Sequence, residues 1–169
     1  MSPAAAILYP LLYFFDTGGW FAALVPTVTF HELGHWAAVR CCGGHVRALR
    51  LDMAGLCMDI SPLSSRKEEI LCAAAGPAAG LLWILPALWA GGSWGSQSAL
   101  AALVINGFNL LPAAPLDGGR ILLALTGDER AVRFSSAAAA TVLLFLAGRW
   151  AQWRLVIPAA LILCSVLRS

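Results

Sequence analysis

Long runs of apolar residues are the feature that most constrains how this chain can fold. The run from Ile70 to Ala90 contains no charged residue, and the run from Trp20 to Cys42 contains only a few ionisable ones. A bilayer core about 30 Å thick is crossed by about 20 apolar residues in a helix. Because 60% of the residues are hydrophobic and only 12% are charged, polar side chains are too few to cover a water-soluble globule. We therefore expect lipid to surround most of the surface.

These runs predict an all-α, polytopic membrane protein with about six transmembrane helices. The expected spans are 3–15, 20–42, 70–90, 99–111 with a half-helix at 116–125, 131–147 and 155–167. Gly91–Ser98, which is polar and rich in glycine, is expected to be a loop between two spans. We expect one transmembrane domain over residues 1–169, with its core at roughly 20–125 and accessory helices at 131–167.

The stretch from Val46 to Ile60 has a different pattern, because apolar and charged residues alternate along it. Alternation with a period of two is typical of a strand with one buried face, and Gly55 lies where a turn is needed. The sequence therefore predicts a short β-hairpin at the membrane surface, directly after the second span.

The basic residues predict the orientation of the chain in the membrane. Most of them, including Arg47, Arg66 and Arg130, lie on the side that would hold both termini and the 41–69 loop. Arg149 and Arg154 fall on the other side. Since cytoplasmic loops carry the excess of Lys and Arg, we expect both termini to be cytoplasmic.

An HExxH pattern, His31-Glu32-Leu33-Gly34-His35, lies inside the second apolar run. Residues four apart project from one face of a helix, so both imidazoles can reach one Zn²⁺. Glu32 would lie beside the metal, where it can accept a proton from water. The alternative is two packing histidines with a glutamate that reaches the interface. Ionisable groups inside a span are costly without a function, which favours the metal site.

A catalytic zinc site requires a third protein ligand, and Asp117 is the best candidate. The extended zinc pattern fails, because Cys41 stands where a third histidine would be. Asp117 follows a Pro-rich break in the apolar sequence, and irregular backbone at membrane depth is tolerated where it lines a cavity. A helix-capping role for Asp117 is the alternative. Asp52 and Asp59 lie in the amphipathic hairpin, where a solvated surface charge is the simpler role.

The chain resembles the site-2 protease family of intramembrane zinc metalloproteases. The similarity lies in His31–His35, in Ala75-Gly76-Pro77, and in Asn109-Leu110-Leu111-Pro112 followed by Pro115-Leu116-Asp117-Gly118-Gly119-Arg120. It is similar above all to the bacterial subgroup that includes the sporulation sigma-factor processing protease. The resemblance implies zinc ligation by His31, His35 and Asp117, a general base at Glu32, and a substrate or oxyanion contact at Asn109.

The resemblance also implies a bacterial cytoplasmic membrane, and it has two departures. Gly80 stands where many relatives carry a polar residue such as Asn. We expect neither the CBS domain of the sporulation subgroup nor the PDZ domains of other subgroups in these residues. A regulatory membrane partner is therefore a candidate for the control of activity.

The sequence thus predicts an intramembrane zinc metalloendopeptidase that cleaves a transmembrane or membrane-associated protein. The rival function is a membrane metal transporter that uses the same His/Glu/Asp cluster as a transit site. Transport favours several weak sites along a pathway, whereas this chain concentrates its intramembrane ligands in one place. A catalytically dead adaptor is disfavoured by the intact Glu32. A net charge of +2 with dispersed basic residues predicts no nucleic-acid partner.

Overall fold

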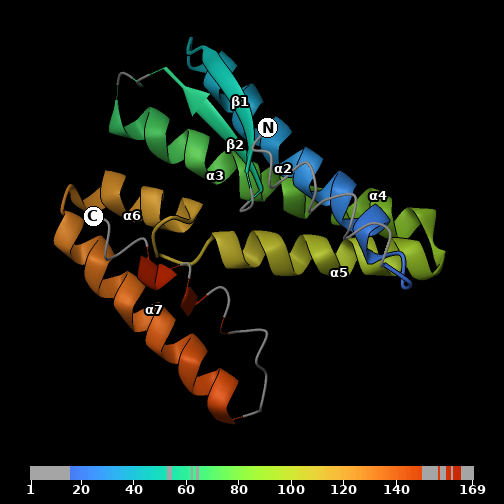
Figure 1. Cartoon of the computed structure of the whole chain (residues 1–169). Coiled ribbons are helices and arrows are strands. Elements are labelled where there is room, and N and C mark those ends of the chain that lie inside the picture. The colour runs from blue at the N-terminus through green and yellow to red at the C-terminus, as the bar shows by residue number, and fades with distance from the viewer. Residues whose placement is uncertain are drawn as a thin grey trace. The chain divides into compact units, whose positions relative to one another are not determined.

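The computed structural model describes residues 16–52, 55–61, 63, 65–149, 156, 159–160 and 162–164 of the chain. The chain forms two compact units, Met1–Gly107 and Phe108–Ser169. The first unit holds α2 (Trp20–Cys41), β1 (Val46–Asp52), β2 (Gly55–Ile60), α3 (Arg66–Leu82), α4 (Ile84–Ala90) and α5 (Gly92–Asn109) up to Gly107, and the second holds α6 (Asp117–Thr126) and α7 (Glu129–Arg149) (Figure 1). The predicted single domain over residues 1–169 stays a prediction.

The described part of the chain is mostly helical, with one two-stranded hairpin, as the sequence predicts. Two helical stretches, Arg66–Ala90 and Glu129–Arg149, are long and apolar enough to cross a membrane. Residues 3–15 lie outside the described residues, as does most of 155–167. The number of about six spans therefore stays a prediction.

The expected loop at Gly91–Ser98 is wrong, because α5 already begins at Gly92. Gly91 and Gly92 both adopt positive φ angles, 71° and 67°, which turn the chain sharply out of α4 without a longer loop. A Cβ on Gly95 would lie 2.3 Å from the carbonyl oxygen of Ala87. Gly91 and Gly92 therefore form a tight turn, and Gly95 allows a close contact between helices. A glycine-rich composition is shared by loops and by such turns and contacts, which is why the sequence predicted a loop.

The predicted hairpin is confirmed. β1 and β2 pair antiparallel, with Val46 opposite Ile60 and Leu51 opposite Leu56. Gly55 is the first residue of β2 and pairs with Asp52, so the glycine lies in the strand and not in the turn as expected. Val46 and Ile60 pack against a buried cluster of Ala38, Val39 and Cys72, which attaches the hairpin to α2 and α3 (Figure 1).

The start of α2 is held by an acidic side chain just outside the helix. The N-cap residue, Gly19, is left-handed and offers no side-chain cap. Instead the carboxylate of Asp16 accepts hydrogen bonds from the backbone N–H groups of Phe21 and Gly18. These bonds, the one from Phe21 first, hold the pKa of the Asp16 carboxyl below its usual value. The α2 helix therefore has a defined first turn three turns before the HExxH residues.

Candidate active site

The α2 and α3 helices approach each other closely at two glycines. A Cβ on Gly34 would lie 2.3 Å from the carbonyl oxygen of Ala75, so only glycine lets the two backbones pack at this distance. On α3, a Cβ on Gly76 would lie 2.2 Å from Nε2 of His35. The imidazole of His35 therefore lies directly over the bare backbone of Gly76, between the two helices.

His35 is oriented by a backbone carbonyl of α3. Its Nδ1 lies 2.7 Å from the carbonyl oxygen of Cys72, and the side chain is 9% exposed. A carbonyl oxygen can only accept a hydrogen bond, so Nδ1 carries the proton. In the neutral imidazole, the lone pair then belongs to Nε2, which is the state that a metal ligand requires.

His31 is oriented in the same way by a side chain of α5. Its Nδ1 lies 2.7 Å from Oδ1 of Asn106, while Nδ2 of Asn106 donates to the carbonyl oxygen of Ala102 at 2.7 Å. A carbonyl oxygen can only accept a hydrogen bond, so the NH₂ group of the amide must face Ala102. The amide oxygen, Oδ1, therefore faces the histidine. His31 therefore donates from Nδ1 and, when neutral, presents the lone pair of Nε2.

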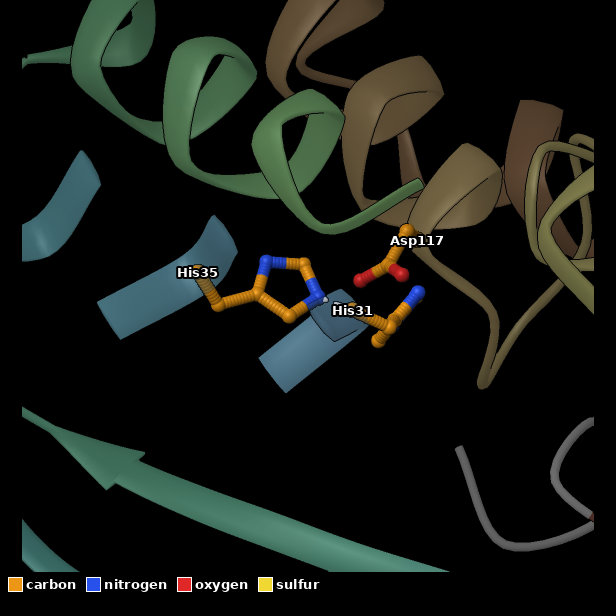
Figure 2. Close-up of side chains that lie close together, drawn as sticks. All are labelled: His31, His35 and Asp117. Carbon is orange, nitrogen blue, oxygen red and sulfur yellow. Dashed lines mark hydrogen bonds between the residues drawn. The ribbon is translucent and has the colours of Figure 1, made fainter. Parts of the chain in front are cut away.

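The two histidine rings converge on one small volume. Their Nε2 atoms lie 3.1 Å apart, the ring planes are inclined at 84°, and both side chains are buried (Figure 2). Two lone pairs at this distance repel each other unless a cation lies beside both. Histidine commonly binds zinc through one ring nitrogen while the other ring nitrogen donates a hydrogen bond. The donor chemistry of this pair therefore fits a zinc ion.

Glu32, the predicted general base, follows His31 on α2 and is half-buried, whereas its neighbour Leu33 is 49% exposed. Asn109, the predicted substrate contact, is the last residue of α5 and is also half-buried. Of the rival acids, Asp59 is half-buried in β2, and the side chain of Asp52 lies outside the described residues. The roles of Glu32 and Asn109 stay predictions.

Asp117 is the first residue of α6, and its side chain is buried within the protein, with the residue 8% exposed. Leu116 occupies the N-cap position and Asp117 lies in the first turn of α6, so the ligand role of Asp117 and the alternative role at the helix start both stay predictions. A carboxylate in the first turn is stabilised by the positive end of the helix dipole. Arg120, one turn further on, places Nη1 3.4 Å from Oδ1 of Asp117.

Two glycines after Asp117 let the irregular segment fold onto the start of α6. A Cβ on Gly118 would lie 2.3 Å from the carbonyl oxygens of Leu110 and Leu111, and one on Gly119 would lie 2.6 Å from the backbone of Ala113. The segment is also held by α7, because the backbone N–H of Ala114 donates to Oγ of Ser136. The Pro-rich break is thus a packed turn that fixes where Asp117 begins its helix.

Asn106 is the residue of this site that the sequence reasoning missed. The one sequence feature that could have indicated it is a polar amide side chain within the apolar run at 99–111, three residues before Asn109. Which helix the amide faces depends on how α5 packs against α2, and no local pattern encodes that packing.

Comparisons with known proteins show the fold and the family of the chain. The chain is similar in fold to the solved structure of the site-2 protease from Methanocaldococcus jannaschii, with a TM-score of 0.74 at 21% sequence identity. The match covers 98% of this chain and 87% of that one. A comparison with curated proteins gives no match. The family model described as Peptidase M50B-like matches residues 4–113, which include the HExxH motif and Asn109 and end before Asp117. Because this match covers well over half of the sequence, the chain belongs to the Peptidase M50B-like family.

Proposed function

We propose that the protein is an intramembrane zinc metalloendopeptidase that cleaves a transmembrane or membrane-associated protein, of the subgroup that includes the sporulation sigma-factor processing protease. The observation that carries this proposal is the pair of HExxH histidines, each with Nδ1 held by a hydrogen bond and Nε2 directed at its neighbour. Membership of a peptidase family and a site-2 protease fold support the same reaction class.

In this proposal His31, His35 and Asp117 hold the zinc ion. All three residues are buried, and each offers one ligand atom, a ring nitrogen or a carboxylate oxygen. Two imidazole nitrogens and one carboxylate oxygen are a usual ligand set for catalytic zinc, which keeps a further position open. When bound, the ion supplies Lewis acidity, which polarises a carbonyl and lowers the pKa of water toward about 7.

Glu32 is the general base of the proposed reaction. It accepts the proton of the attacking water as the oxygen bonds to the scissile carbonyl carbon. It then delivers that proton to the leaving nitrogen as the C–N bond breaks. Asn109, at the end of α5, holds the substrate backbone or the developing oxyanion with its amide.

The protein is proposed to be a multi-pass protein of a bacterial cytoplasmic membrane, with both termini in the cytoplasm. Two apolar helical stretches and the site-2 protease fold support a membrane location. Its substrate partner is a membrane protein segment, and a further membrane protein is proposed to regulate it.

Cleavage of a single-span membrane protein by the purified chain in detergent tests the function. We expect a defined product that disappears on addition of a zinc chelator and returns with Zn²⁺. The same preparation in Zn²⁺-loaded vesicles tests the rival function. Movement of metal across the vesicle membrane, with no cleavage of any substrate in a panel of single-span proteins, would show that the cluster is a transit site.

Substitution of Asp117 tests the ligand set. Asp117→Ala is expected to lower zinc content and cleavage together, because two histidines alone hold the metal weakly. The matched control is Asp128→Ala, which removes an exposed carboxylate that accepts from the backbone N–H of Arg130. Zinc content is measured by elemental analysis of the purified variants. If Asp117→Ala keeps normal zinc content and full cleavage, another acid is the ligand, and Asp52 is the next to test.

Labelling from outside the cell tests the orientation. With the exposed cysteines Cys41 and Cys164 replaced by serine, a membrane-impermeant thiol reagent should label Ser96→Cys and not Ser64→Cys. The reason is that the distribution of basic residues predicts a cytoplasmic 41–69 loop. Labelling in the opposite pattern would reverse the orientation and place the loop outside.

A further inference from the structure

We propose that Asn106 is a positioning residue for the metal, and that glycine at position 80 provides the space that Asn106 needs. This inference rests on the proposed metallopeptidase function. It assigns a role to an α5 residue outside the HExxH motif and to a glycine of α3, both of which lie in the same compact unit as the histidines.

The Asn106 amide is a bridge between α5 and α2. The residue is completely buried, at 0% exposed, and its side chain makes one hydrogen bond at each end. Nδ2 is anchored on the carbonyl oxygen of Ala102, one turn earlier in the same helix, and Oδ1 accepts from Nδ1 of His31. With Nδ2 committed to a carbonyl, the amide has only an acceptor to offer to the histidine.

That acceptor selects both the tautomer and the orientation of His31. A proton on Nδ1 leaves the lone pair on Nε2, the atom that lies 3.1 Å from Nε2 of His35. The equivalent support of His35 is the main-chain carbonyl of Cys72, which side-chain substitution does not remove. The support of His31 is a side chain, so it can be deleted, altered and restored.

Gly80 lies against the same amide. A Cβ at this position would lie 2.2 Å from Oδ1, 2.3 Å from Nδ2 and 2.4 Å from Cγ of Asn106. Contacts this short force a neighbour to move, and here the neighbour is held at both ends by hydrogen bonds. Gly107, which directly follows Asn106, has open space around it instead, because a Cβ there would meet nothing within 4 Å. The two glycines therefore form a matched pair for substitution.

The first test compares two substitutions of Asn106 by zinc affinity, measured in competition with a chelator. Asn106→Leu has a similar volume and no acceptor, and we expect zinc affinity to fall by about 10-fold to 100-fold. Asn106→Asp keeps an acceptor for Nδ1 of His31, and its affinity should stay well above that of Asn106→Leu. If the two variants bind zinc equally, the hydrogen bond to His31 is not what Asn106 contributes, and the proposal fails.

A readout without metal separates this inference from the proposed function. In the metal-free protein labelled with ¹⁵N-histidine, the nitrogen chemical shifts report which ring nitrogen of His31 is protonated. We expect Nδ1–H in the wild type and a shift of the population toward Nε2–H in Asn106→Leu. This result would support the positioning role even in a protein that failed to bind zinc. An unchanged tautomer in Asn106→Leu would overturn the inference even if the enzyme cleaved its substrate.

The second test is a double-mutant cycle between positions 80 and 106, again read by zinc affinity. Gly80→Ala should weaken zinc binding, whereas Gly107→Ala should leave it at the wild-type value. In the Asn106→Ala background, the truncated side chain makes room for the new methyl group, so Gly80→Ala should cause little further loss. Full additivity of the two losses would show that Gly80 acts independently of Asn106 and would contradict its assigned role.

Discussion

Replacing Glu32 with Gln is expected to reduce the rate of substrate cleavage by at least about 10²-fold while zinc stays bound. Glutamine keeps the shape of the side chain and removes its ability to accept a proton from water. The hydrogen-bond partners of Nδ1 in His31 and His35 are Asn106 and the carbonyl of Cys72, which the substitution of Glu32 does not change. The metal should therefore remain in place while proton transfer is lost.

Two measurements on the same preparation check this expectation, namely single-turnover cleavage and zinc content. Glu69→Gln is the matched control, because it makes the same change at an exposed residue in the first turn of α3 and should leave both values unchanged. Loss of zinc together with activity in Glu32→Gln would mean that Glu32 is a ligand and not the base. Full activity would remove Glu32 from the mechanism.

The helix that presents the candidate site could be predicted from sequence because its signals are local. The apolar run predicted a helix at 20–42, observed as α2 at Trp20–Cys41, and the four-residue spacing of His31 and His35 placed both rings on one face. The hairpin was predicted for the same reason, since alternation is a property of neighbouring residues. In the structure the two rings do lie on one face of α2, with their Nε2 atoms 3.1 Å apart.

The parts that sequence reasoning missed depend on contacts between helices. Asn106 is 75 residues from His31 in the chain, and nothing near it indicates its partner. The glycines at 91–95 were predicted to form a loop because composition alone cannot distinguish a glycine that turns the chain from one that admits a neighbouring helix. Gly95 is of the second kind, because its backbone packs closely against the carbonyl oxygen of Ala87.

The departure at Gly80 has a physical explanation in this structure. The resemblance to the site-2 protease family leads one to expect a polar residue such as Asn at this position, and glycine there left a polar contact unexplained. The space next to the Gly80 backbone is filled by the amide of Asn106. The glycine on α3 and the buried amide on α5 thus belong to one packing arrangement, because the amide occupies the space that a side chain at position 80 would need.

Gly76→Ala is expected to remove zinc binding more completely than any substitution outside the ligands. The new methyl group would lie 2.2 Å from Nε2 and 2.4 Å from Cε1 of His35, so the ring must leave its position. The ring cannot turn away without breaking the hydrogen bond from Nδ1 to the Cys72 carbonyl, which would leave buried polar groups unsatisfied. Zinc affinity should fall by at least about 100-fold, and crowding between α2 and α3 should cost about 1–3 kcal/mol of stability.

Gly148→Ala is the control for Gly76→Ala, because it makes the same change within α7 where a Cβ would meet nothing within 4 Å. Zinc affinity and the midpoint of thermal unfolding are measured on both variants in the same detergent. The two readouts separate the causes, since a general packing defect lowers stability in the presence and absence of a chelator alike. Displacement of His35 instead abolishes the stabilisation that added Zn²⁺ gives the wild type. A folded Gly76→Ala protein with wild-type zinc affinity would show that His35 does not bind the metal over Gly76, and the proposed ligand set would have to be revised.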